Sequence, residues 1–423
     1  MRTLPDGLPG AIMAIESISD ARAFLHGPGG CRIRHMVHSS AVFPRDGQET
    51  DDGYHIPYFF GYPRVPATYL DEHDYINGAA YKVAEGLPLI LSKDPALVVI
   101  INSPGAGLIG DNFEKALQNL GKDSEVICLD ESFASMPFTY CYDNVLKTIM
   151  EALKPEKIRT EKDTVNIIGL TIMDKDWKVA ADELRTIIES MGLEVKSIPG
   201  AGASVSELRD SVNAEYNIVV CPEVCAGLSE LYGSYGVKTI RSDHGAPVGF
   251  DATESWIKAI AEATGRDPSK SIAPIHKAKE RVYEKFIGNK YNSLRIKGMS
   301  FSAAGTASVI RPLTEWLYHY LAMAPVAVSL DPGADKDESE ALKAFLDSTG
   351  YPGSFGREPK EGSGAVLCDG VTAYTMSLNG KCRIGIPIGY SSMGLDDVMP
   401  RPVYGVQGAM YILDEILHGV RGS

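Results

Sequence analysis

Short apolar runs alternate with amphipathic segments along most of this chain. Residues 97–101 form one such run, a segment of small residues follows at 102–107, and a helical pattern occupies 111–120. A strand, a loop and a helix repeated in this order are typical of parallel sheets covered by helices on both faces. The same pattern predicts strands at residues 125–129, 165–170, 195–198, 216–220, 299–303, 326–330, 365–368 and 383–388.

The spacing of apolar residues predicts helices between these strands. A helix over residues 177–191 carries its apolar side chains near the 3.6-residue period and stops at Gly192. Ser204 and Glu207 have the spacing of a capping box, which predicts a helix beginning at this point. The last helix carries apolar residues from Val406 onward and ends at Gly419.

The repetition predicts an α/β fold with three doubly wound αβα (Rossmann-like) domains and mainly parallel sheets. Polar, turn-rich segments near residues 157–163 and 264–271 place the domains at 1–160, 161–265 and 266–423, with a linking helix at 275–292. In such sheets, ligands bind beyond the carboxyl ends of the strands. The positions to examine are therefore residues 102–107, 129–131, 221–225, 331–333 and 369–370.

Composition narrows the functional classes. The chain has 423 residues, a net charge of −14, 44% hydrophobic residues and 23% charged residues. These values are typical of a folded globular protein, and the acidic balance disfavours binding to nucleic acid. We find neither an apolar run of the roughly 18 residues that span a bilayer nor a signal-peptide pattern, so we expect a cytoplasmic protein without a membrane partner.

One candidate metal site is the segment at residues 26–38, where Cys31 follows a Gly-Pro-Gly-Gly turn. Arg32 and Arg34 are expected to lower the pKa of the Cys31 thiol and favour the metal-binding thiolate. The alternatives are a tight turn before a helix with surface histidines, or a mononuclear zinc site. The zinc site would use His26, Cys31, His35 and His38.

A second candidate is Cys221, which ends an apolar strand and precedes Pro222 and Glu223. This pattern predicts a cysteine at a helix N-cap, where the helix dipole would stabilise a thiolate. The alternative is a small buried apolar residue, the usual state of a free cysteine. The seven cysteines include no CxxC pair and do not indicate a disulfide framework.

Two further features carry less specific information. The glycine-rich turn at residues 103–107 has a form that binds anions, but the chain has neither a GxGxxG motif nor a P-loop, so any ATP would be hydrolysed by another protein. Aromatic residues gather at 54–69, where we expect a core or a subunit interface rather than a pocket wall.

The order of several motifs resembles the nitrogenase component 1 family, which includes the molybdenum–iron protein subunits, dark-operative protochlorophyllide reductase and nickel-tetrapyrrole reductive cyclase components. The similarity extends over essentially the whole chain and agrees with three αβα domains. The resembling segments are residues 8–11 with 26–31, 67–87, 102–111, 217–221 and 401–408.

The resemblance implies site residues as well as a fold. Cys31 matches a cysteine of the family's bridging iron–sulfur cluster, whereas Asp6 and Ser103 fall where the family has its other two cluster cysteines. An aspartate has precedent in the chlorophyll-forming relatives, and serine oxygen can ligate iron, although less strongly than thiolate. Cys221 matches the cysteine that anchors the large cofactor, and Tyr404 falls at the position of the opposing histidine.

The function that the resemblance implies is a nitrogenase-like oxidoreductase component. A separate Fe-protein-like ATPase would pass electrons through an iron–sulfur cluster, a [4Fe–4S] cluster at a dimer interface with Cys31 from each chain, to an unidentified substrate or second cofactor near Cys221. The partner chain would be a second copy, as in most oligomers, or a paralogue. The alternative is a non-catalytic scaffold or carrier for a metal cluster or tetrapyrrole, favoured by the loss of two cluster cysteines and of the cofactor histidine.

Overall fold

The structure is a computed structural model that describes residues 2, 4–31, 42, 44, 65–113, 117, 125–129, 131, 133, 135–287, 294–390 and 397–421. The chain forms two compact units, which we describe separately. Unit 1 comprises Met1–Leu4, Arg159–Ile198 and Asn213–Ser423, and unit 2 comprises Pro5–Ile158 and Pro199–Val212.

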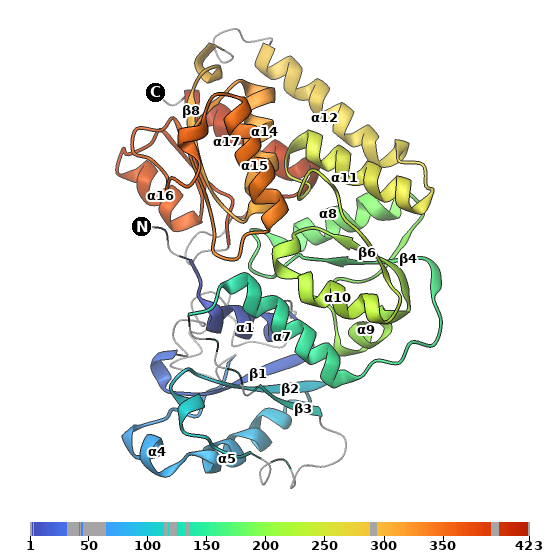
Figure 1. Ribbon diagram of the computed structural model, residues 1–423, viewed down its shortest axis with the longest axis vertical. Helices are drawn as coiled ribbons and strands as arrows, with labels where there is room; N and C mark the ends of the chain where they lie inside the picture. Colours follow the sequence, from blue (N-terminus) through green and yellow to red (C-terminus); the bar gives the residue numbers. More distant parts are fainter. Residues whose placement is uncertain are drawn as a thin grey trace. The chain divides into compact units, whose positions relative to one another are not determined.

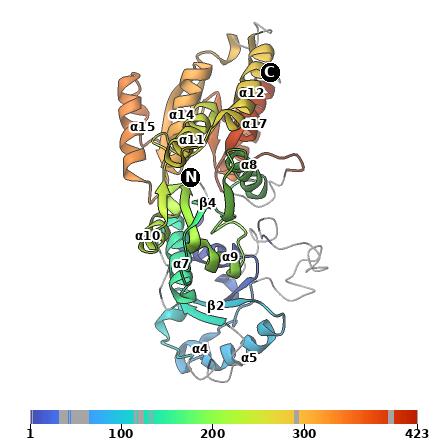
Figure 2. The ribbon, with the colours of Figure 1, turned by 90° about the vertical axis from the view of Figure 1, so that its right-hand side faces the viewer.

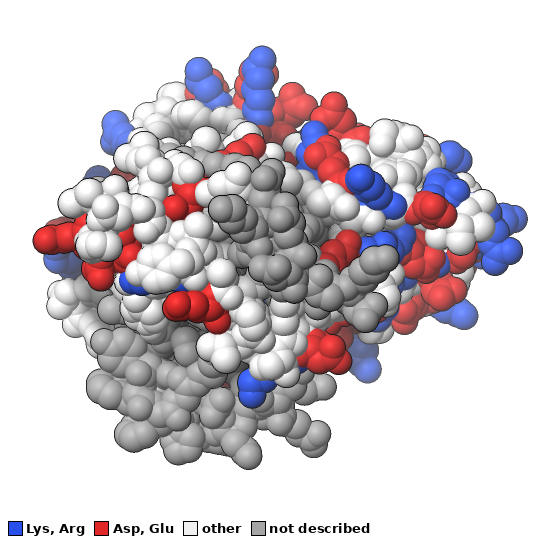
Figure 3. Space-filling view, turned by 90° about the horizontal axis from the view of Figure 1, so that it is seen from below, with Lys and Arg blue, Asp and Glu red and all other residues white. Residues whose placement is uncertain are grey.

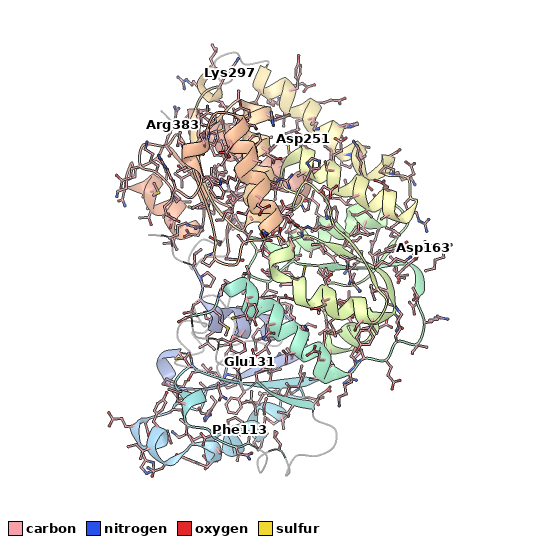
Figure 4. All side chains as sticks on the ribbon, in the orientation of Figure 1. Phe113, Glu131, Asp163, Asp251, Lys297 and Arg383 are labelled. Atoms are coloured by element: carbon pink, nitrogen blue, oxygen red, sulfur yellow. The ribbon has the colours of Figure 1, made fainter. Side chains whose placement is uncertain are left out.

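Unit 2 is built on a parallel three-stranded sheet in the order β1-β2-β3. Its middle strand is the apolar run predicted from the sequence, and all six of its residues are buried. A core cluster that includes Phe24, Leu87 and Phe113 fills the space between this sheet and α5 (Figure 4). The elements are α1 Gly7–Glu16, β1 Ala21–His26, α4 Glu72–Asn77, α5 Ala80–Leu91, β2 Leu97–Asn102, η3 Ala106–Leu108, β3 Glu125–Leu129, α7 Phe138–Leu153 and α9 Val205–Asp210.

Helix α1 is buried along its whole length because it packs closely on α7. A Cβ atom on Gly7 would lie 2.4 Å from the carbonyl oxygen of Phe133, and one on Gly10 would lie 2.7 Å from that of Phe138. The two glycines therefore permit an approach between the helices that larger side chains would block.

The first half of unit 1 contains a parallel sheet in the order β5-β4-β6-β7. The predicted capping box of Ser204 and Glu207 is present at α9, in the segment that unit 2 contributes between two of these strands. The elements are β4 Glu161–Ile168, α8 Trp177–Glu189, β5 Glu194–Ser197, β6 Ala214–Val219, η5 Pro222–Val224, α10 Ala226–Ser234, β7 Lys238–Ile240, α11 Gly249–Thr264 and α12 Ser269–Ile287. The short turn η4 Ser211–Asn213 contains the point at which the chain returns from unit 2 to unit 1.

The second half of unit 1 contains a parallel sheet in the order β11-β10-β8-β9. Figures 1 and 2 show α14 and α15 on one side of this sheet and α17 on the other. The elements are β8 Ser300–Gly305, α14 Ala307–Leu321, β9 Ala324–Leu330, α15 Lys336–Ser348, η6 Pro352–Ser354, β10 Ala365–Cys368, α16 Gly370–Leu378, β11 Ile384–Pro387 and α17 Gly405–Arg421.

The predicted α/β class is confirmed, since every strand pairing in the described part of the chain is parallel. Most of the helix predicted at 111–120 lies outside the described residues, as does the aromatic stretch at 54–62. The division into three domains stays a prediction, because the strands form three sheets whereas compactness divides the chain into two units.

Charged side chains of both signs are present on the surface of the described residues (Figure 3). On the face drawn in Figure 3, basic and acidic side chains of the described residues are intermixed. Within the part of the chain that the structure describes, we find no helix both long and apolar enough to cross a bilayer.

Candidate functional site

Both four-stranded sheets of unit 1 reverse their strand order, and each reversal marks a place for a ligand. The chain leaves β4 for one side and returns to pair β6 on the other, and β8 stands in the same relation to β10. Crevices in doubly wound sheets lie at the carboxyl ends of such strand pairs. The residues there are Gly169–Asp174 after β4, Cys221–Glu223 after β6, Gly305–Ser308 after β8 and Asp369 after β10.

Cys221 and Tyr404 meet at the carboxyl ends of β4 and β6. The Sγ atom of Cys221 lies 3.2 Å from the hydroxyl oxygen of Tyr404. The Tyr404 hydroxyl donates a hydrogen bond to Asp174 Oδ1 at 3.0 Å. The other oxygen of Asp174 accepts from the backbone N–H of Thr171 at 2.7 Å and from its hydroxyl at 2.9 Å. We call Cys221, Tyr404, Asp174 and Thr171 the thiol chain.

A glycine at the end of β4 sets the position of Cys221. The backbone N–H of Cys221 donates to the carbonyl oxygen of Gly169 at 3.2 Å. Gly169 has a φ of +85°, and a Cβ on it would lie 2.4 Å from the carbonyl oxygen of Cys221. Only glycine combines this conformation with this approach, so the two strand ends can meet backbone to backbone.

A glutamate from α8 holds Tyr404 in place. Glu183 Oε1 accepts from the backbone N–H groups of Val406 at 2.6 Å and Gln407 at 3.0 Å, and so caps the first turn of α17. Gly405 has a φ of +75°, and a Cβ there would lie 2.5 Å from the Glu183 carboxyl carbon. Burial raises the pKa of Glu183 to about 7, although the two backbone hydrogen bonds act against the rise.

A second carboxylate, that of Glu223, connects the loop after β6 in the first sheet of unit 1 with the segment after β8 in the second. Glu223, which is buried, accepts from the Ser308 hydroxyl at 2.6 Å and from the Ser308 backbone N–H at 2.8 Å. Ser308 lies in the first turn of α14, so an acidic side chain of the protein already occupies this helix terminus. Burial raises the pKa of Glu223.

The structure places Cys221 at the predicted N-cap position but opposes the thiolate predicted there. The residue precedes only the three-residue turn η5, makes no side-chain cap, and is 4% exposed. Burial, together with the negative charges of Asp174 and Glu223, raises the pKa of the Cys221 thiol well above its usual value. The expected helix dipole is missing because α10 begins only at Ala226. Cys225 is buried, as expected of a core residue, and donates to the carbonyl oxygen of Cys221 at 3.3 Å.

His26, the last residue of β1, is hydrogen-bonded to side chains from two other segments of unit 2. Its Nε2 lies 3.0 Å from Asp111 Oδ2, and its Nδ1 lies 3.1 Å from the Thr68 hydroxyl, which also accepts from the Gly27 N–H at 3.0 Å. Asp111 in turn accepts from the Ala79 N–H. His26 is fully buried, and burial lowers its pKa despite the neighbouring carboxylate.

These contacts argue against the mononuclear zinc site. Both ring nitrogens of His26 already have hydrogen-bond partners, so the ring has no nitrogen left for a metal. His35 and His38, together with Arg32 and Arg34, lie outside the described residues. Among the residues that are described, no three His, Cys, Asp or Glu side chains converge on a possible metal position.

Cys31 and Ser103 face a common neighbour in unit 2. Cys31 is partly exposed at the end of the described 4–31 segment, and Ser103 is buried directly after β2. The Tyr75 hydroxyl is hydrogen-bonded to Ser103, and the charge of Cys31 raises the pKa of Tyr75 further than burial alone does. A Cβ on Gly27 would lie 2.7 Å from Ser103 Oγ, so the loops carrying Cys31 and Ser103 are in direct contact.

The third predicted ligand, Asp6, has a different setting in the same unit. It is exposed at the N-terminal end of α1, and its backbone forms a bridge with Pro137. Its charge acts on the buried thiol of Cys141, whose pKa is raised to about 12 chiefly by burial.

The donor set of one chain falls short of a four-iron cluster. Such a cluster takes four protein ligands, preferably thiolates. The three candidate ligands are the partly exposed thiol of Cys31, a serine oxygen that already accepts the Ala106 N–H at 3.3 Å, and an exposed aspartate. These residues do not complete a cluster by themselves and fit one only if a second chain supplies the remaining ligands.

Two functional candidates are not evident from the sequence. The first is Asp174. It is one of several polar residues in the loop after β4, and nothing in the sequence shows that it is hydrogen-bonded to Tyr404, 230 positions away. Tyr390, just after β11, is partly exposed, but its hydroxyl is buried, and burial together with the charges of Asp331, Asp174 and Cys221 raises its pKa. The available signal for Tyr390 is its place after an apolar strand.

Comparison with known proteins identifies the family. The family model described as nitrogenase component 1 type oxidoreductase matches residues 8–420. The B-type subunit of light-independent protochlorophyllide reductase from Chloroflexus aurantiacus is 28% identical over 171 residues, which cover 40% of this chain and 31% of the relative. Its counterpart from Zygnema circumcarinatum is 22% identical over 294 residues, covering 66% of this chain and 52% of the relative. These alignments thus span between about a third and a half of the relatives' length.

Solved structures agree with the fold. Nitrogenase Cp1 at pH 6.5 superimposes with a TM-score of 0.75 and 16% identity, covering 100% of this chain and 94% of that chain. Nitrogenase Cp1 at pH 5 gives a TM-score of 0.70 and 15% identity, with coverage of 100% and 90%. At these identities the likeness concerns the fold, and the α/β architecture implied by the resemblance is therefore confirmed.

Proposed function

Because the chain belongs to the nitrogenase component 1 type oxidoreductase family, we propose that it is the reductase component of a nitrogenase-like system. In this proposal a separate Fe-protein-like ATPase supplies electrons, an iron–sulfur cluster at Cys31 receives them, and a substrate near Cys221 is reduced. The family match over residues 8–420 is the observation that carries the proposal. The absence of a P-loop in the chain is consistent with ATP hydrolysis by a partner.

The cluster in this proposal is shared by two chains. One chain contributes the thiol of Cys31, and a [4Fe–4S] cluster would be completed by Cys31 of a second copy or by the equivalent residue of a paralogue. Ser103 and Asp6 are the oxygen donors that would supplement the thiolates. When bound, such a cluster accepts and releases one electron at a time.

An exposed apolar surface around Cys31 supports pairing with a second chain. Leu108 is 89% exposed and Ile76 is 81% exposed, and the exposed rings of Tyr69 and Tyr75 precede Ile76 in the chain. Tyr69 packs against Gly29, and Tyr75 packs against Gly105, so both rings border the loops that carry Cys31 and Ser103. Large exposed apolar and aromatic side chains gathered in one place are typical of protein–protein interfaces.

The residues of this chain that would act on a substrate are those of the thiol chain. Cys221 and Tyr404 present neutral hydrogen-bonding groups at the carboxyl ends of β4 and β6. Asp174, whose pKa burial raises to about 6, can hold or release a proton at Oδ1 near neutral pH. In this proposal, the thiol chain therefore binds the substrate and supplies the protons that accompany its reduction.

Iron analysis on anaerobically purified protein tests the proposal. We expect iron and an EPR-active cluster in the wild type, loss of both in Cys31→Ala, and retention of both in Cys368→Ala, which removes a fully buried thiol from the core of the second sheet. Less than about one iron per dimer after reconstitution would contradict the electron relay.

The alternative is a scaffold or carrier that holds a metal cluster or tetrapyrrole for transfer. The two oxygen donors, Asp6 and Ser103, favour it, because oxygen ligands hold iron less firmly than thiolates do. Turnover separates the two functions: a reductase consumes substrate when the Fe-protein ATPase, ATP and a reductant are added, whereas a scaffold binds and releases its cargo without reducing it.

A further inference from the structure

We infer that the site at Cys221 and Tyr404, beyond the carboxyl ends of β4 and β6, holds no resident metal cofactor. This inference deepens the proposed function and rests on it for the identity of the reaction. It concerns the second cofactor that the resemblance implies at Cys221 and Tyr404. The contacts of these two residues oppose the binding of such a group.

The donor set at this place is unsuited to a metal. A metal cofactor anchored here needs a thiolate and an opposing ligand of strong affinity, such as an imidazole. The described structure presents a thiol and a phenol, 3.2 Å apart and bonded to each other. Tyr404 also donates to Asp174 at 3.0 Å, so its hydroxyl is engaged on both sides.

Hydrogen bonds already engage the two residues that would hold the cofactor. The buried side-chain polar atoms of Cys221 and Tyr404, and those of the neighbouring Glu223, have protein partners in the described structure. An anchored cofactor would have to break the bond between Cys221 and Tyr404.

The charges around this site also disfavour a metal-binding thiolate. The charged groups that act on the Cys221 thiol are the carboxylates of Asp174 and Glu223. A thiolate at this place would add a negative charge beside two others, away from water. Lys175, next to Asp174 in the chain, is paired with Asp397.

Cys31 offers the contrasting case. Cys31 is partly exposed in the loop after β1, close to the exposed ring of Tyr69, whereas Cys221 is 4% exposed. A metal site completed by a second chain needs an accessible thiol, and of these two cysteines only Cys31 is accessible.

Metal content of the purified holoprotein tests the inference. Iron and other transition metals are measured by mass spectrometry in anaerobic wild type, Cys221→Ser and Cys31→Ser. We expect the metal content and EPR spectrum of Cys221→Ser to equal those of the wild type, and those of Cys31→Ser to fall to background. A loss of metal in Cys221→Ser with Cys31 intact would overturn the inference.

A second measurement keeps the test valid if Cys221→Ser fails to fold or if the wild type contains no iron. Cd²⁺ is titrated into metal-free protein, and the thiolate-to-cadmium absorption is recorded. We expect Tyr404→His, which leaves Cys221 in place and supplies an imidazole opposite it, to gain an absorption that the wild type lacks and that Cys221→Ser removes. A wild-type signal that depends on Cys221, or no gain in Tyr404→His, would contradict the reasoning from the donor set.

The outcomes separate this inference from the proposed function. If the wild type contains no iron, the proposed electron relay is contradicted. The cadmium titration then still decides whether Cys221 binds a metal. Iron that is lost in Cys31→Ser but retained in Cys221→Ser supports both this inference and the proposed function.

Discussion

The hydroxyl of Tyr404 lies 3.2 Å from the sulfur of Cys221, although 183 positions separate the two residues along the chain. One follows β6 in the first sheet of unit 1, and the other precedes α17, which packs beside the second. Their contact ties the two halves of unit 1 together at the edge where a ligand is expected.

Removing the Tyr404 hydroxyl is expected to cost more stability than removing a comparable one nearby. Tyr404→Phe leaves a buried thiol and the carboxylate of Asp174 without this partner, so we expect a loss of about 2 kcal/mol in the free energy of unfolding. The control is Tyr411→Phe within α17, which loses one bond at 3.1 Å to the Pro387 carbonyl and should cost about 1 kcal/mol. Denaturant unfolding measures both, and equal costs would contradict the stated role of Tyr404.

The close approach of Gly169 to Cys221 predicts a large effect for a small substitution. Gly169→Ala introduces a Cβ 2.4 Å from the Cys221 carbonyl oxygen at a φ of +85°, and we expect a loss above ~3 kcal/mol. Gly350→Ala is the matched control, because Gly350 has a φ of +88° with no atom within 4 Å of the added Cβ. Backbone strain alone should then cost about 1 kcal/mol, and thermal unfolding would show the difference. Similar losses in both variants would mean that the backbone contact is easily relaxed.

Glu183 makes the stability of the α17 cap depend on pH. Its pKa is raised from 4.5 to about 7, so the folded state favours the protonated carboxyl. This contribution to stability is fully present below pH 4.5 and is lost as the pH rises through about 7. Glu183→Gln keeps an oxygen acceptor and carries no charge. Relative to the wild type, it should therefore gain roughly 2 kcal/mol between pH 5 and pH 8. Urea unfolding at the two pH values checks this, and a constant difference would show that the pKa is unshifted.

His26 is expected to be a structural residue of the Cys31 loops. His26→Ala leaves Asp111 and Thr68 without the ring that joins them and opens a cavity against Phe113, so we expect a loss of roughly 3 kcal/mol. His418→Ala, at an exposed position paired with Asp414 one turn earlier, should change stability by less than about 0.5 kcal/mol. Chemical denaturation with and without added Zn²⁺ measures both variants. A wild type whose stability depended on Zn²⁺ would restore the zinc interpretation.

The sequence determined the architecture of this protein. The run at residues 97–101, the helix ending before Gly192 and the capping box at Ser204 all depend on neighbours within a few positions, and the structure contains each of them. Apolar periodicity and turn residues are local signals, and the alternation of strands and helices constrains the chain to parallel sheets. Strand ends could likewise be named in advance, and Cys221 is one of them.

Tertiary structure alone decided the chemical state of the candidate residues. The N-cap pattern at Cys221 predicted a thiolate, yet burial and the carboxylates of Asp174 and Glu223 raise the pKa of the thiol. The Asp174 carboxylate comes from a distant segment, and the electrostatic free energy of a group depends on everything within several ångströms of it, not only on its neighbours in sequence. For the same reason the partnership of Cys221 with Tyr404, and the engagement of both nitrogens of His26, could be read only from the folded chain.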